Sequence, residues 1–149
     1  AKIDATWPIA DCQRPHGLGI APADHRLFAS CVNSTLLAVD STNGKVIANL
    51  SIGKGSDAAG YDAVRKRVFS SNFDGTLSVI RQDTPQHYIE LGNVPTHELA
   101  RTMALNPQTG RVYLVAADRI EVDPSATDPR KRYAVRPGSV ALLFADPTD

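Results

Sequence analysis

The sequence lacks several features that would assign it to a functional class. Acidic and basic residues number 16 each, so no charge excess points to nucleic acid or to an anionic membrane. No apolar run is long enough to span a bilayer. The glycine-containing stretch at residues 53–56 lacks the spacing of a phosphate-binding loop. We therefore expect no cofactor, no nucleic-acid partner and no membrane span.

Histidine and cysteine are also scarce. The four histidines show no H-x-H or HExxH spacing, which argues against a zinc site. The two cysteines, Cys12 and Cys31, belong to no CxxC or CxxCH motif, so thiol-redox chemistry and covalent haem have no support. One cysteine pair is compatible either with two buried thiols or with one disulfide.

Size and composition are those of an ordinary globular protein. The chain has 149 residues, of which 42% are hydrophobic and 21% charged, so a single folded unit is expected. The first residue is Ala1 rather than an initiator methionine, which is compatible with a removed leader or a longer precursor.

The chain does contain a repeated hairpin. Residues 67–81 read RVFSSNFDGTLSVIR, two segments of strand-forming residues joined by turn residues. The same design occurs at residues 26–40 as RLFASCVNSTLLAVD and begins again at residues 111–118 as RVYLVAAD. A spacing of roughly forty residues is that of a four-stranded propeller blade. The sequence therefore predicts an all-β fold of the β-propeller class.

We predict about three blades in this chain. They cover residues 16–52, 57–91 and 101–149, and the last blade lacks its outer strand and contains a long loop at 119–137. Short strands of small residues, such as GLGIA at 17–21, suit the innermost position, where blades converge. Residues 1–9 have the pattern of an outer strand without a hairpin partner.

Two predicted strands are left without a neighbour. The segment from Lys2 to Ile9 has no partner, and the strand from Ser139 to Phe144 has a free outer edge. Free edges promote aggregation, so both are expected to be paired. Three blades do not close a ring, so the partner is either a second copy joined head to tail or further blades of a longer chain.

The repeats resemble those of the YVTN (Tyr-Val-Thr-Asn) β-propeller family. The resemblance rests on FSSN at 69–72 followed by GTLSVI at 75–80, and on TLLAVD at 35–40 followed by TNGKVIA at 42–48. The four-letter motif is degenerate elsewhere, as FASC at 28–31 and YLVA at 113–116. The chain looks most like the C-terminal half of bacterial exported members, which have about seven blades. This implies a propeller in the periplasm or outside the cell, but no single activity, because propellers host unrelated functions.

The repeat pattern also bears on the cysteines. Cys12 lies in the loop before one innermost strand, and Cys31 ends the neighbouring second strand. Antiparallel pairing brings both to the same end of the blade, within reach of a disulfide. We favour an oxidised pair in an exported protein, with two buried thiols as the alternative.

Aligning the repeats gives candidate ligand-binding residues. His16, Asp57 and Arg101 each stand just before an innermost strand, where a propeller opens its central channel. A convergent polar set in a concave surface is typical of a ligand site. His97 and Glu98 precede Arg101 and are further candidates. The alternative is that these side chains pair with one another and close the channel.

Two functions fit these residues. The first is a non-catalytic binding or scaffold module whose channel mouth takes a small-molecule or protein ligand. The second is a metal-dependent, lactonase-like hydrolase with a metal held by His16 and Asp57, a set too small for a divalent ion without further ligands. The loop at 119–137 leaves the same face, and we expect it to be mobile and dispensable for folding.

Overall fold

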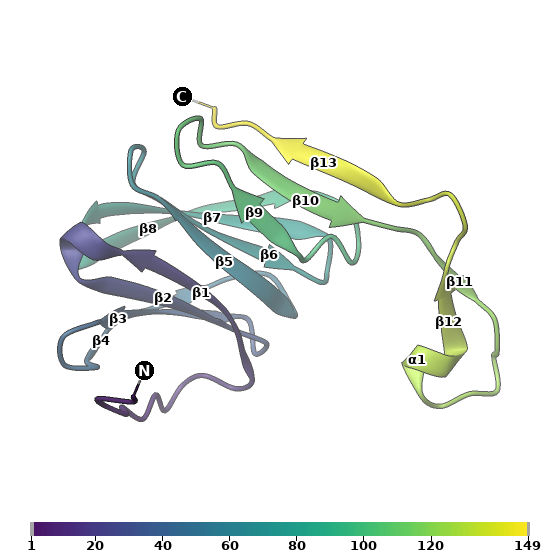
Figure 1. Ribbon diagram of the computed structural model, residues 1–149, viewed down its shortest axis with the longest axis horizontal. Coiled ribbons are helices and arrows are strands. Elements are labelled where there is room, and N and C mark those ends of the chain that lie inside the picture. The colour runs from purple at the N-terminus through teal and green to yellow at the C-terminus, as the bar shows by residue number, and fades with distance from the viewer. Residues whose placement is uncertain (1, 149) are drawn as a thin grey trace.

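The repeated hairpins fold into two four-stranded antiparallel sheets, each with its strands in sequence order. The computed structural model describes residues 2–148 and is 51% strand, so the chain is all-β as predicted (Figure 1). The first sheet consists of β1 (Pro15–Ala21), β2 (Arg26–Cys31), β3 (Thr35–Asp40) and β4 (Val46–Ser51), with the short 3-10 helix η1 (Pro22–Asp24) after β1. The second consists of β5 (Ser56–Asp62), β6 (Arg67–Asn72), β7 (Thr76–Thr84) and β8 (His87–Pro95).

The third sheet has three strands. Its order is β13 (Ala141–Ala145), β10 (Val112–Ala116) and β9 (Met103–Leu105), so β13 has a free outer edge among the residues described. The three sheets stand side by side as successive blades (Figure 1).

Small residues let the innermost strands approach closely. A Cβ atom on Gly17 of β1 would lie 2.4 Å from the backbone nitrogen of Ala59 on β5. A Cβ on Gly19 would lie 3.4 Å from Gly60. Real Cβ atoms do not tolerate the first distance, so a larger side chain at Gly17 would push the two blades apart.

Two apolar clusters hold the blades together, one at each junction. Between the first and second blades, the buried ring of Phe28 lies 5.3 Å from the ring of Tyr61 and 5.9 Å from that of Tyr88. Between the second and third blades, Phe69 and Leu77 pack with residues of β9 and β10. Burial of such side chains contributes roughly 1.5–3 kcal/mol each, and here it stabilises blade stacking rather than single sheets.

The predicted disulfide is confirmed. Cys12 and Cys31 are bonded, with Cα atoms 5.4 Å apart. Cys31 is fully buried at the end of β2. The disulfide therefore links the segment before β1 to the end of β2, the strand that pairs with β1.

The strand predicted for residues 1–9 is not formed over residues 2–9, and residue 1 lies outside the described part. A strand needs a partner for its backbone groups. The free edge of β13 is at the opposite end of the array from the N-terminal segment (Figure 1). Instead, Trp7 packs on the turn at Gly44, whose φ of +75° suits glycine.

The long segment at 119–137 is not the irregular loop that the sequence suggested. It forms a two-stranded hairpin of β11 (Arg119–Glu121) and β12 (Tyr133–Val135), with the one-turn helix α1 (Pro129–Arg132) at its tip. Asp128 caps α1 by accepting a 3.0 Å hydrogen bond from the backbone N–H of Arg130. We call β11, α1 and β12 the arm. It projects away from the blades (Figure 1). No helix within residues 2–148 is long and apolar enough to cross a bilayer.

Candidate functional site at the inner strand ends

His16 and Asp57 each lie at an irregularity at the start of an innermost strand. The register between β1 and β2 shifts around His16, and the register between β5 and β6 shifts around Asp57. A bulge of this kind re-aims the extra side chain. Nδ1 of His16 accordingly lies 3.3 Å from Oδ1 of Asp57, and Nε of Arg101 lies 4.0 Å from the same oxygen. The structure thus brings three predicted residues together, and we call them the inner-end cluster.

The carboxylate of Asp57 is the centre of this cluster. Its side chain is 25% exposed, between a histidine and an arginine that are both more exposed. Ion pairs at this exposure contribute little to stability because solvent screens them. These two ion pairs therefore hold the side chain of Asp57 only weakly.

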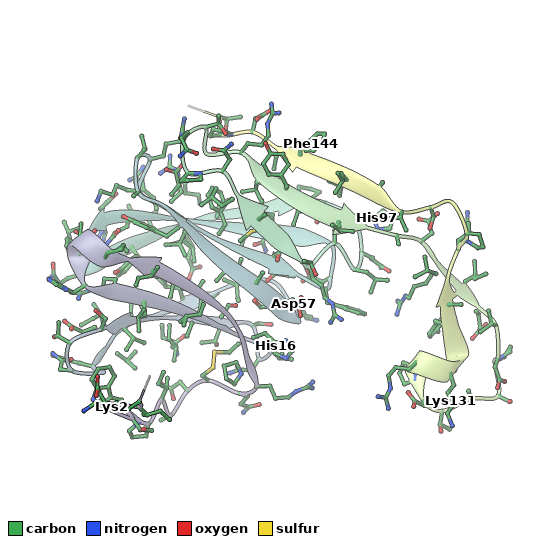
Figure 2. All side chains as sticks on the ribbon, viewed as in Figure 1. Lys2, His16, Asp57, His97, Lys131 and Phe144 are labelled. Carbon is green, nitrogen blue, oxygen red and sulfur yellow. A yellow bond between two sulfur atoms is a disulfide. The ribbon has the colours of Figure 1, made fainter. Side chains whose placement is uncertain are left out.

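His97 and Glu98 do not join the inner-end cluster. Nε2 of His97 lies 3.0 Å from Oδ1 of Asp118, at the base of the arm. The other carboxylate oxygen of Asp118 lies 3.4 Å from Nη1 of Arg136. Figure 2 shows His16, Asp57 and His97 along the strand ends on the side from which the arm departs. The five candidates therefore fall into two groups on one face.

Both ring nitrogens of His97 have an acceptor. Nδ1 lies 2.6 Å from the backbone carbonyl oxygen of Glu98, and Nε2 faces the carboxylate of Asp118. Only the imidazolium donates two hydrogen bonds. The carbonyl of Glu98, followed by the carboxylate of Asp118, therefore raises the pKa of His97 above its usual value.

Phe73 connects the two groups. The guanidinium carbon of Arg101 lies 5.8 Å from the centre of its ring, and that of Arg119 lies 5.4 Å from the same centre. Arg119 also lies over the ring of Tyr133, at 4.8 Å. Both distances from Arg119 are within the range of cation–π attraction.

Phe73, Asp118 and Arg119 are not among the candidate residues that the sequence predicts. Phe73 carried a signal, because it is an aromatic residue in an otherwise polar turn between two strands. Asp118 and Arg119 carried none, since they stand where the repeat at 111–118 gives way to a segment for which the sequence predicts a mobile loop.

A cleft of about 580 Å³ lies at the base of the arm, and we call it the arm cleft. It is lined by residues 96–99 and 117–119 together with Tyr133 and Arg136. Thr96 contributes to its wall, and the Oγ1 of Thr96 is buried without a hydrogen-bond partner among residues 2–148. Charged groups and one aromatic ring therefore surround an open space.

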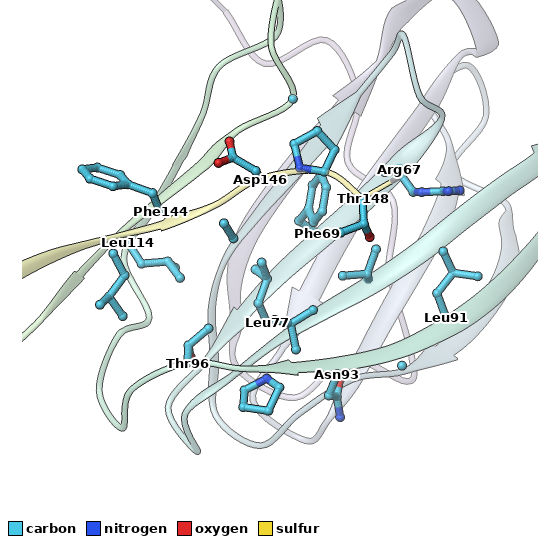
Figure 3. Close-up of a pocket in the computed structure, with 18 of the residues that line it drawn as sticks. Arg67, Phe69, Leu77, Leu91, Asn93, Thr96, Leu114, Phe144, Asp146 and Thr148 are labelled. Carbon is cyan, nitrogen blue, oxygen red and sulfur yellow. The ribbon is translucent and has the colours of Figure 1, made fainter.

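A larger groove of about 890 Å³ lies between the second and third blades (Figure 3). Phe69 and Leu77 line its floor, and Leu91 and Leu114 line its walls. It adjoins β13, whose outer edge is unpaired among the described residues. The groove has an apolar centre with polar side chains such as Arg67 and Asp146 in its lining, and it shares Thr96 and His97 with the arm cleft.

Metal-ligating side chains do not gather in the described part of the chain. Within residues 2–148, no three His, Cys, Asp or Glu side chains lie close enough to share a metal ion. The inner-end cluster supplies one imidazole and one carboxylate.

Sequence comparison finds no matching protein-family model and no matching curated protein. Solved structures do match, and they have propeller-like folds. Hydrazine synthase of Kuenenia stuttgartiensis matches with a TM-score of 0.62 and 17% identity over 78% of this chain and 33% of the other. Sqt1 of Saccharomyces cerevisiae matches with a TM-score of 0.60 and 9% identity over 89% of this chain and 34% of the other. The chain thus has a β-propeller fold and spans about a third of the length of these proteins.

Proposed function

We propose that this chain is a non-catalytic β-propeller module that binds a small-molecule or protein ligand at the face formed by its inner strand ends. The inner-end cluster carries the proposal. His16 and Arg101, at the entries to the first and third innermost strands, lie beside the partly exposed carboxylate of Asp57 at the entry to the second. A few convergent polar groups on a rigid scaffold are typical of binding sites.

We further propose that the protein is a YVTN-type propeller exported to the periplasm or outside the cell. The repeats at 35–48 and 69–80 support the first part of this proposal. The bond between Cys12 and Cys31 supports the second, since disulfides persist mainly in oxidising compartments.

The module is proposed to work as part of a larger ring. The blades would be completed by a second copy or by additional blades, through the segment from Lys2 to Ile9 and the strand edge between Ser139 and Phe144. The exposed side chains of Leu142 and Phe144, at 62% and 58% exposure, support a partner at this end.

Ligand-dependent thermal stability tests the binding function. A panel of small molecules is screened against the wild-type protein, Asp57→Asn and the matched surface control Asp4→Asn, whose aspartate is 78% exposed. At least one ligand is expected to raise the Tm of the wild type and the control but not that of Asp57→Asn.

The same proteins are assayed for lactone hydrolysis with and without added divalent metal. Metal-dependent turnover that is lost in Asp57→Asn would contradict a non-catalytic module and would assign the lactonase-like activity instead. No turnover, together with a ligand that needs Asp57, agrees with the proposal.

A further inference from the structure

Arg119 is held by aromatic rings rather than by a carboxylate. Its guanidinium carbon lies over the rings of Tyr133 and Phe73. Its nearest carboxylate oxygen among residues 2–148, Oε2 of Glu98, is 3.9 Å from Nη2, which is too far for a hydrogen bond. The Glu98 side chain is itself 73% exposed, so this ion pair is weak.

The other cations at the base of the arm are already matched. His97 and Arg136 share the carboxylate of Asp118, one on each oxygen. Arg132, which also lies over Tyr133, donates a 2.5 Å hydrogen bond from Nε to Glu121. Arg119 therefore differs from Arg132, Arg136 and His97 in lying against two aromatic rings with no carboxylate oxygen of residues 2–148 within 3.5 Å.

The guanidinium of Arg119 combines partial burial with N–H donors that no carboxylate of residues 2–148 accepts. The side chain of Arg119 is 33% exposed, so two thirds of its surface is withdrawn from water. Packing over aromatic rings covers the faces of a guanidinium and leaves its in-plane N–H donors available. Those donors fit the two oxygens of a carboxylate or phosphate group. Arg119 also lines the arm cleft, which gives a ligand room to reach them.

We propose that Arg119 anchors an oxyanion-binding site in the arm cleft, which takes the carboxylate or phosphate group of a small organic ligand. This inference rests on the binding function proposed above and gives that ligand a chemical class. Arg136 and His97 line the same cleft, and both are paired with Asp118. Glu98 and Asp118 are the opposing carboxylates, and Asp118 is neutralised by its two partners.

The test is a titration of the intact protein with inorganic phosphate and, separately, with succinate, at constant pH and ionic strength. The NMR resonance of the Arg119 Nε–H group is followed. We expect a saturable shift with at least one of the two anions. A response to phosphate alone identifies a phosphate ligand, and a response to succinate alone identifies a carboxylate ligand.

Two matched variants decide whether Arg119 is the anchor. Arg119→Lys keeps the positive charge but loses the planar guanidinium with its paired N–H donors. The Kd for the anion, measured from the shifts of the His97 ring resonances, is expected to rise at least tenfold. Arg132→Lys removes a guanidinium from the same aromatic ring, and the Kd is expected to stay unchanged. Arg119→Gln provides a second variant, and the Tm of each protein shows that it is folded.

The inference is overturned by the absence of any saturable shift with either anion, or by equal affinity in the wild type and Arg119→Lys. If Arg119 has only a structural role, its variants lower the Tm and leave the Kd unchanged. The Arg119 site and the proposed binding function can fail separately. A ligand that stabilises the wild type through Asp57 but is indifferent to Arg119 would remove this site and leave the proposed function standing.

Discussion

Asn72 is a fully buried polar residue at the end of β6, beside the turn into β7. The two N–H donors of its amide face the carbonyl oxygens of Ser70 and Thr76, at 3.2 and 3.1 Å, and the hydroxyl of Ser78 at 3.0 Å. Ser78 in turn accepts the backbone N–H of Gly53 from the loop between the first two blades. This asparagine therefore links the turn of one blade to its neighbour.

Replacing Asn72 by alanine is expected to lower the free energy of unfolding by about 2–4 kcal/mol, because several buried groups lose their partner at once. Asn43→Ala is the control. Asn43 accepts one hydrogen bond in an exposed turn, and its loss should lower the free energy by less than about 1 kcal/mol. Denaturant unfolding of both variants checks the difference, and equal losses would contradict the role given to Asn72.

The histidine at the base of the arm gives a pH-dependent prediction. The pKa of His97 is raised, so its contribution to stability is fully present below the unfolded value of about 6.5. That contribution is lost as the pH rises through the folded pKa. The effect on stability is small, since the side chain is 40% exposed.

An NMR titration of the His97 ring tests this directly. Asp118→Asn is expected to lower the pKa of His97 only part of the way to 6.5, because the carbonyl of Glu98 remains. Asp123→Asn, elsewhere between β11 and α1, should leave the pKa of His97 unchanged. A full return to 6.5 in Asp118→Asn would mean that the carbonyl contributes nothing.

At the scale of elements, hairpins were predictable and their irregularities were not. Alternating residues around turns such as Asn72–Gly75 place β6 and β7, and the same pattern places β2 and β3. The register shifts at His16 and Asp57 carry no sequence signal, because a bulge depends on how two strands pair. Those shifts orient the side chains of the inner-end cluster. The candidate residues could therefore be predicted from the sequence, but the contacts between them could not.

The sequence predicts a loop where the arm lies, because the strands of the arm have only three residues each and are mostly exposed. Short exposed strands lack the alternation that identifies longer ones. The contact between Phe73 and Arg119 joins a turn of the second blade to the arm of the third. A contact between distant segments has no local pattern, which is why the arm cleft was not predicted.

The arm is expected to be dispensable for folding. Its helix α1 has no buried residue, and the arm projects from the blades (Figure 1). Replacing residues 119–137 by a short glycine-containing turn should change the Tm of the protein by no more than a few degrees. A large decrease, measured by calorimetry, would mean that the arm is part of the cooperative core.

The disulfide is expected to stabilise the first blade modestly. It closes a loop over a sequence separation of 19 residues, so its removal in Cys12→Ser/Cys31→Ser should lower the free energy of unfolding by about 3 kcal/mol. Thiol titration of the unfolded, unreduced wild type should find no free sulfhydryl. Two free sulfhydryls would contradict the bond itself.

For the whole molecule, we expect the two ends of the blade array to determine the state of assembly. The exposed apolar side chains of β13 and the unpaired segment at residues 2–9 lie at opposite ends (Figure 1). We expect the isolated chain to dimerise head to tail or to aggregate, and we expect deletion of residues 1–9 to abolish the dimer. Light scattering measures this, and a soluble, cooperatively melting monomer would contradict it.

The bond between Cys12 and Cys31 also has a mechanical consequence. A pulling force applied to the N-terminal segment would enter the blade at Cys12 and pass through the sulfur bridge to the buried end of β2. Strand β1 lies between the two cysteines in the chain, so tension would bypass it instead of unzipping it from β2. Under reducing conditions the same pull would peel β1 away one hydrogen bond at a time. The disulfide thus protects the pairing of β1 with β2 against a force applied to the N-terminal segment.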